Sequence, residues 1–172
     1  MCWWNNALYD TCSLITLSLV LESQPAIRKH FSGVLTVEEC LSSDNLRIDS
    51  KSRIERFVAR IVDLPGPVDL SRILVKANLP SATAGVDALV YSAAVHHSYP
   101  VVTADKSLAK ALAGLGLHGG TMAMVLRDLV ENDLLSVDAC RKLLQELSER
   151  NEFILPANVP PTWEQLRQYR FP

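Results

Sequence analysis

The fold of this chain is decided by the stretch Ala7-Leu8-Tyr9-Asp10-Thr11-Cys12-Ser13-Leu14-Ile15, in which an apolar run ends at an acid and an apolar helix begins. Residues 7–9 have the pattern of a buried strand, and residues 11–21 that of the helix after it. The same order of strand and helix returns over 33–41 and over 100–115. Strands that alternate with helices predict an α/β fold with three layers, α/β/α, around a central, mostly parallel sheet.

The remaining segments predict further helices around this sheet. Helical spacing of apolar residues favours helices over 51–62, 69–77, 86–94, 122–130 and 137–147, a short helical piece over 24–30, and a weak last strand over 117–121. Loops are expected over 42–50 and 80–85. From residue 156 onward, where Pro160 and Pro161 interrupt the pattern, we expect an arm that is either docked or mobile. The predicted division is a domain over residues 1–155, with additional C-terminal helices, and a C-terminal arm over 156–172.

Composition sets the class of protein. The chain has 172 residues, 48% of them hydrophobic, which favours one domain with a substantial core. The net charge of -2 gives no overall attraction to nucleic acid, so such contact would need a local basic patch. The longest apolar stretch, residues 14–21, is too short to cross a bilayer, and residues 1–5 lack the features of a signal peptide. We therefore expect a cytoplasmic protein that does not associate with membranes.

Four acids occupy positions that would converge in such a sheet: Asp10, Glu39, Asp87 and Asp105. Each follows a predicted strand or opens a predicted helix, and parallel α/β sheets bind ligands outside the carboxyl ends of their strands. Four carboxylates without nearby bases repel one another, whereas Mg²⁺ or Mn²⁺ would hold them together through oxygen ligands. The cysteines of the chain lack the paired spacing that would predict a zinc site.

Each acid also has a structural explanation when it is taken alone. Asp10 and Asp105 could cap helices, Asp87 could interact with the positive end of its helix, and Glu39 could be solvated beside Glu38. The joint pattern favours the metal site, because Asp10 and Asp105 are flanked by core-forming residues. A carboxylate in that position is costly to desolvate unless it is paired or bound to metal.

The chain resembles the PIN-domain nucleases, which include VapC-like toxins and larger uncharacterised members. The resemblance covers residues 6–125 and rests on four segments in the family's order: Leu8-Tyr9-Asp10-Thr11, Thr36-Val37-Glu38-Glu39, Val86-Asp87-Ala88 and Thr103-Ala104-Asp105. In this register Glu39 matches the family's glutamate, and Glu38 is the alternative. Cys12 stands where the family usually has Ser or Asn. The resemblance implies a PIN-like nuclease domain over residues 1–155.

The resemblance implies a metal-dependent endoribonuclease. One version of this expectation is that the protein is the toxin of a type II toxin–antitoxin pair. Its catalytic acids would be Asp10, Glu39, Asp87 and Asp105, with Asp10, Asp87 and Asp105 as ligands of one or two Mg²⁺ or Mn²⁺ ions. The partners that it implies are RNA, an antitoxin protein and a second copy of the chain in a homodimer.

Other residues are assigned supporting roles around the acids. Thr11 and Thr103 are predicted to hydrogen-bond the carboxylates. Lys106 and Lys110, together with Arg28 and Lys29, are the bases predicted to contact phosphate near that edge. In the arm, Trp163, Tyr169 and Arg170 could stack on bases or cover an apolar patch, and the sequence favours the patch.

Several other functions remain as competing hypotheses. The main alternative is a catalytically inactive PIN-like module that serves RNA binding or protein assembly, for which Cys12 and the sparse basic residues are the motivation. A receiver domain would need acids clustered after the first strand, where only Asp10 stands. Gly114, Gly116 and Gly119 follow a helix, which is the wrong context for a dinucleotide-binding loop.

Overall fold

Short parallel strands form the centre of the protein. The computed structural model describes residues 2–44, 46–77, 79, 85–152 and 161–170. Within them the sheet has the order β3-β2-β1-β4-β5, and every pairing is parallel. The strands are β1 Leu8–Tyr9, β2 Leu35–Thr36, β3 Arg60–Ile61, β4 Val101–Val102 and β5 Gly119–Gly120. The predicted α/β class and the parallel sheet are confirmed.

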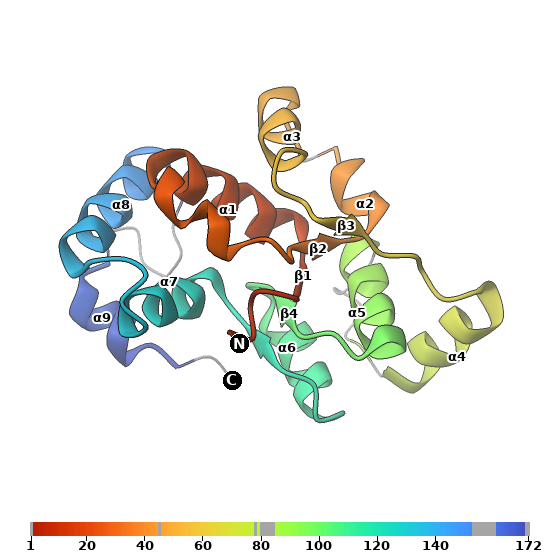
Figure 1. Cartoon of the computed structure of the whole chain (residues 1–172). Helices are drawn as coiled ribbons and strands as arrows, with labels where there is room; N and C mark the ends of the chain where they lie inside the picture. The colour runs from red at the N-terminus through yellow and green to blue at the C-terminus, as the bar shows by residue number, and fades with distance from the viewer. Residues whose placement is uncertain (1, 45, 78, 80–84, 153–160, 171–172) are drawn as a thin grey trace.

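The helices divide between the two faces of the sheet. The strand order runs outward from β1 in both directions. Crossovers between parallel strands are right-handed, so the helices that connect strands in one direction lie on the opposite face from those that connect strands in the other. Figure 1 shows α1, α7 and α8 on one side of the strands and α4 and α5 on the other. Helix α6 packs against α5. The bounds of these helices are α1 Thr11–Ser23, α4 Pro67–Ala77, α5 Val86–His97, α6 Lys106–Ala113, α7 Met122–Glu131 and α8 Val137–Glu149.

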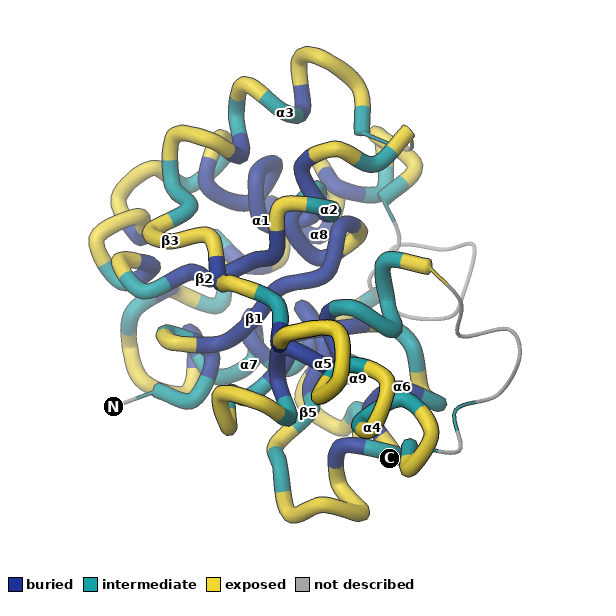
Figure 2. Tube along the Cα trace, turned by 90° about the vertical axis from the view of Figure 1, so that its right-hand side faces the viewer, coloured by how far each residue is buried: buried dark blue, intermediate teal, exposed yellow. Residues whose placement is uncertain are grey.

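Four shorter helices fill the ends of the layers. The 3-10 helix η1 Pro25–His30 and α3 Ile48–Ile54 pack against α1, and α2 Glu38–Leu41 packs against α5. Helix α9 Trp163–Gln168 lies on α7 and α8. Figure 2 shows the buried part of the trace running through the central strands, α1 and α8, while α4 has no buried residue. No helix formed by the described residues is both long enough and apolar enough to span a bilayer.

The passage from β1 to α1 follows directly from the opening sequence. Leu8 and Tyr9 are completely buried, and Leu8 pairs with Leu35 on one side and Val101 on the other. The next residue, Asp10, is the N-cap of α1 and accepts a hydrogen bond of 2.7 Å from the backbone N–H of Ser13. This cap satisfies one of the free N–H groups at the helix start, so the strand ends and the helix begins at this acid.

One predicted helix is partly wrong. Helix α3 begins earlier than expected, inside the segment 42–50 predicted as a loop, and ends at Ile54 instead of continuing to Val62. Residues Arg60–Ile61 form the edge strand β3, in register with Leu35–Thr36. The helical spacing of apolar residues continued past Ile54, but pairing with β2 decides the conformation of this segment, as long-range contacts often override local pattern.

The weak last strand was predicted correctly, and the structure explains its glycines. A Cβ atom on Gly120 would overlap the ring of Trp3, which lies against the strand. Trp3 in turn donates a hydrogen bond of 2.8 Å to the carboxylate of Asp128 on α7. Glycine therefore lets the N-terminal segment cover the β5 edge of the sheet.

The described part of the C-terminal arm, residues 161–170, is docked on the domain. Thr162 and Gln165 form a capping box at the start of α9, and Leu166 is completely buried. Arg127 donates a hydrogen bond of 3.3 Å to the carbonyl of Tyr169, and Arg141 pairs with Glu164 at 3.4 Å. The apolar face of α9 therefore joins the core, which agrees with the apolar-patch prediction for the arm.

This docking predicts the effect of Leu166→Ala. The substitution leaves a cavity under α9 and should lower the free energy of unfolding by about 2–4 kcal/mol, measured by urea denaturation. Gln168→Ala, on the exposed side of the same helix, is the control and should be nearly neutral. Equal effects of the two substitutions would contradict the docked position of the arm.

Candidate metal centre

Asp10 is a buried carboxylate at the centre of the sheet's carboxyl edge. Only 5% of the residue is exposed. Its backbone N–H continues the pairing with β4 through a bond of 3.3 Å to the carbonyl of Val102. Burial raises the pKa of the Asp10 carboxyl, and hydrogen bonds from Thr103, Ser13 and Ala104 oppose this by favouring the charged form. The side chain is thus poorly hydrated and held in place.

Thr103 links this acid to the next one. Its hydroxyl donates to the Asp10 carboxylate and accepts a bond of 3.0 Å from the backbone N–H of Asp105. Asp105 caps α6 by accepting bonds of 2.7 Å from Ser107 and 3.2 Å from Leu108. Thr103, predicted to hydrogen-bond the carboxylates, is therefore a fully buried residue between two neighbouring strand ends.

Asp87 approaches both of these acids from α5. It lies in the first turn of that helix and is partly buried. Burial raises the pKa of the Asp87 carboxyl, and the negative charges of Asp10 and Asp105 raise it further. The structure therefore brings together the three acids predicted as metal ligands, from segments that are far apart in the sequence.

In the part of the chain that the structure describes, no basic side chain balances this group. Among the residues that the structure describes, no Lys, Arg or His forms an ion pair with Asp10, Asp87 or Asp105. Within the same residues, no three Asp, Glu, His or Cys side chains stand as a ready-made set of metal ligands. The acids are near enough to repel, and a shared ion would require their side chains to turn toward one another.

The predicted glutamate lies at the margin of this group. Glu39 is half-buried on α2, whereas its neighbour Glu38 is exposed. Helix α2 packs against α5, the helix that carries Asp87. Glu39 is not among the charges that raise the pKa of Asp87. Of the two candidate glutamates, Glu39 is therefore the less exposed, on a helix that contacts the one carrying Asp87.

The hydroxyl of Thr11, predicted to hydrogen-bond a carboxylate, has a backbone carbonyl as its partner. The hydroxyl of Thr11 donates to the carbonyl of Cys40 at 3.5 Å and joins α1 to α2. Ser13 provides both a backbone and a side-chain hydrogen bond to Asp10. Because Ser13 provides these bonds, Cys12 at the position usual for Ser or Asn does not leave Asp10 without a neighbouring donor.

The predicted phosphate-contacting bases fall into two places. Lys106 opens α6 immediately after Asp105, Lys110 lies in the last turn of that helix, and both are exposed. Arg28 and Lys29 are in η1, which follows the far end of α1. Helix α1 leads away from the carboxyl edge, so these two residues do not lie near the acids, and their predicted role beside them is wrong.

Glu152 is a further carboxylate that sequence reasoning missed. It follows α8, accepts a hydrogen bond from Thr16, and lines a cavity of about 140 Å³ with Cys12, Ser13 and Thr121. Burial, then the charges of Asp10, Asp87 and Glu152, raises the pKa of the Cys12 thiol to about 11. No local motif marks Glu152, because only the packing of α8 on α1 brings it here.

Comparison with known proteins adds no family to this geometry. No protein-family model, no curated protein and no solved structure matches the chain. The function is therefore argued from the site itself.

The burial of Asp10 predicts a pH-dependent loss of stability when divalent ions are removed. The fold raises the pKa of Asp10 and Asp87 above their ordinary value of 3.8. The folded protein therefore binds these protons more tightly than the unfolded chain, and its stability falls as pH rises from that value through the raised pKa. In EDTA at neutral pH, Asp10→Asn should be more stable than the unmodified protein, since the amide oxygen keeps the cap and the charge is lost.

Urea denaturation in EDTA measures this difference. The control is Asp63→Asn, which removes a charge from an exposed residue and should have little effect. An Asp10→Asn protein less stable than the unmodified one across this pH range would show that the ionised carboxylate is stabilising and would refute the repulsion described above.

Proposed function

We propose that this protein is a Mg²⁺- or Mn²⁺-dependent endoribonuclease with a PIN-like fold. The observation that carries the proposal is the meeting of Asp10, Asp87 and Asp105 at one edge, with mutual repulsion and without a basic partner among the described residues. Carboxyl groups that perturb one another's pKa at the carboxyl edge of a parallel sheet are candidates for a functional site. An oxygen-only donor set suits hard divalent cations.

The position of the acids in the sheet supports the proposal. The strand order reverses between β1 and β4, because β2 and β3 are added on one side of β1 and β4 and β5 on the other. Ligands of open α/β sheets bind at such a reversal, outside the carboxyl ends of the strands. Asp10 follows β1 and Asp105 follows β4, so these two acids flank the expected position.

The residues of the site would bind the ion, orient the water or contact the RNA. Asp10 and Asp105 would hold a first ion, and Asp87 would complete the set or hold a second. When bound, the ion supplies a lower pKa for a nearby water and compensates the charge of the phosphodiester. Thr103 keeps Asp10 and Asp105 in register through one hydroxyl. Glu39 would orient the attacking water, and Lys106 and Lys110 would contact the phosphates of RNA.

The proposal includes the partners that the resemblance implies. An antitoxin would neutralise the enzyme if it is the toxin of a type II pair, and the extra helices α7 to α9 offer surface for a homodimer.

Cleavage of RNA tests the enzymatic part of the proposal. Asp10→Asn should reduce the rate of Mn²⁺-dependent cleavage by about 10²-fold or more, because a principal ion ligand is lost. The assay follows a labelled single-stranded RNA with and without EDTA. Asp63→Asn should cleave at the unmodified rate. Metal-dependent cleavage that persists unchanged in Asp10→Asn would remove this residue from the mechanism.

Metal titration separates the nuclease from an inactive PIN-like module. An ion that binds only the folded protein should raise the free energy of unfolding by about 2.7 kcal/mol at a hundred times its dissociation constant. Thermal denaturation at increasing Mn²⁺ measures this effect. A module that has lost the metal site would show no shift, and the same flat response is expected of Asp10→Asn.

A further inference from the structure

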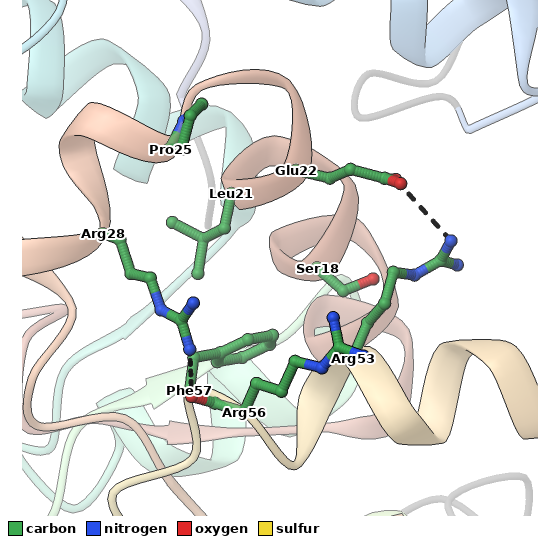
Figure 3. Close-up of a pocket in the computed structure, with 8 residues that line it drawn as sticks. All are labelled: Ser18, Leu21, Glu22, Pro25, Arg28, Arg53, Arg56 and Phe57. Atoms are coloured by element: carbon green, nitrogen blue, oxygen red, sulfur yellow. Dashed lines mark hydrogen bonds and ion pairs between the residues drawn. The ribbon is translucent and has the colours of Figure 1, made fainter.

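A second cavity, distant from the acids, is lined by basic residues. It lies between α1, η1 and α3, has a volume of about 150 Å³, and brings together Arg28, Arg53 and Arg56 with Phe57 and Glu22 (Figure 3). We call it the arginine pocket. The overall charge of the chain is -2, so three arginines in the lining of one pocket are a feature that composition alone does not reveal.

The arginines of this pocket are only partly neutralised. Among the described residues, Glu22 is the only acid in the lining, and it is shared between Arg53 at 3.6 Å and Arg150 at 2.9 Å. Arg53 also lies 3.8 Å from Asp49, yet its buried Nε has no hydrogen-bond acceptor among the described residues. The three arginines of the lining therefore outnumber the two carboxylates, Glu22 and Asp49, that pair with them.

Arg28 and Arg56 line the side of the pocket formed by η1 and the end of α3 (Figure 3). Arg28 donates a hydrogen bond to the backbone carbonyl of Arg56, which holds η1 against the end of α3. The guanidinium of Arg56 is exposed, and within the described residues it makes no hydrogen bond or ion pair. Figure 3 shows both side chains reaching into the region beside the Phe57 ring. A bound anion would meet guanidinium groups next to an aromatic ring.

We propose that the arginine pocket binds a backbone phosphate of single-stranded RNA, with the neighbouring base against Phe57. Guanidinium groups bind phosphate oxygens through paired, charge-assisted hydrogen bonds. An aromatic ring beside a basic groove is the arrangement that holds single-stranded nucleic acid without sequence preference. RNA is favoured over an acidic peptide for two reasons. The inference rests on the proposed function, which acts on RNA, and a base can stack on the Phe57 ring whereas a carboxylate cannot.

The pocket and the acids lie along the same helix. Asp10 caps α1, while Ser18 and Glu22 of the pocket are about 12 Å and about 18 Å farther along its axis, from the rise of 1.5 Å per residue. A strand held at the arginine pocket would be tethered to the protein at a point remote from the cleaved bond. The pocket would therefore contribute to RNA affinity without taking part in the chemistry.

The test measures RNA binding in EDTA, where no ion-dependent cleavage is needed. The probe is a fluorescent single-stranded RNA of about 12 nucleotides, followed by anisotropy over a range of salt concentrations. Arg56→Glu should weaken binding by about tenfold and lower the salt slope by about 0.7 for the lost phosphate contact. The matched control is Arg72→Glu, the same charge change on exposed α4 at the other face of the sheet, and it should retain most of the affinity.

Phe57→Leu gives an independent measure of the stacking contact. This substitution keeps an apolar side chain against the core and should weaken RNA binding severalfold while leaving the salt slope unchanged. Circular dichroism establishes that each variant is folded.

Three results would overturn the inference. They are unchanged RNA binding by Arg56→Glu, equal loss in Arg56→Glu and Arg72→Glu, and equally tight binding of a polyglutamate peptide that competes with RNA. Because the assay contains no divalent ion, these outcomes are distinct from a failure of the nuclease proposal, which the cleavage of RNA by the unmodified protein decides.

Discussion

The burial of one carboxylate at the end of β1 is the constraint on which the rest of the site depends. Asp10 terminates the central strand, caps α1 and is desolvated between neighbouring strand ends. Hydrogen bonds from Ser13 and Thr103 hold it in that position, although they do not remove the cost of its charge. Asp87 and Asp105 add repulsion at the same edge. A divalent cation is the simplest partner that would convert this unfavourable arrangement into a stabilising one.

Helix α1 separates two opposite charge environments. Its N-terminal end meets the three aspartates, and the cavity beside its C-terminal half is lined by Arg28, Arg53 and Arg56. A nuclease acting on RNA benefits from both, since one end would do the chemistry and the other would hold the negatively charged strand. A chain with a small net charge can thus still bring several arginines together in one place.

The sequence predicted the parts of the structure whose causes are local. Asp10 and Asp105 follow fully buried strands and cap the helices after them, so their position at the sheet edge could be inferred from short segments. Strand β3 could not be inferred from a short segment, because its two residues are exposed and only their pairing with β2 makes them a strand. Glu152 and the arginine pocket arise where helices distant in sequence meet, and no local spacing marks such contacts. Arg28 was wrongly predicted to lie near the acids for the same reason, because its position depends on where α1 ends.

Anomalous diffraction from Mn²⁺-soaked crystals measures the central claim most directly. The account predicts an anomalous peak within ligand distance of the Asp10 and Asp105 carboxylates, with the Asp87 side chain turned toward it. A structure at saturating Mn²⁺ that shows no peak at this edge, or a peak held by other residues, would contradict the proposal that these three acids share a metal ion.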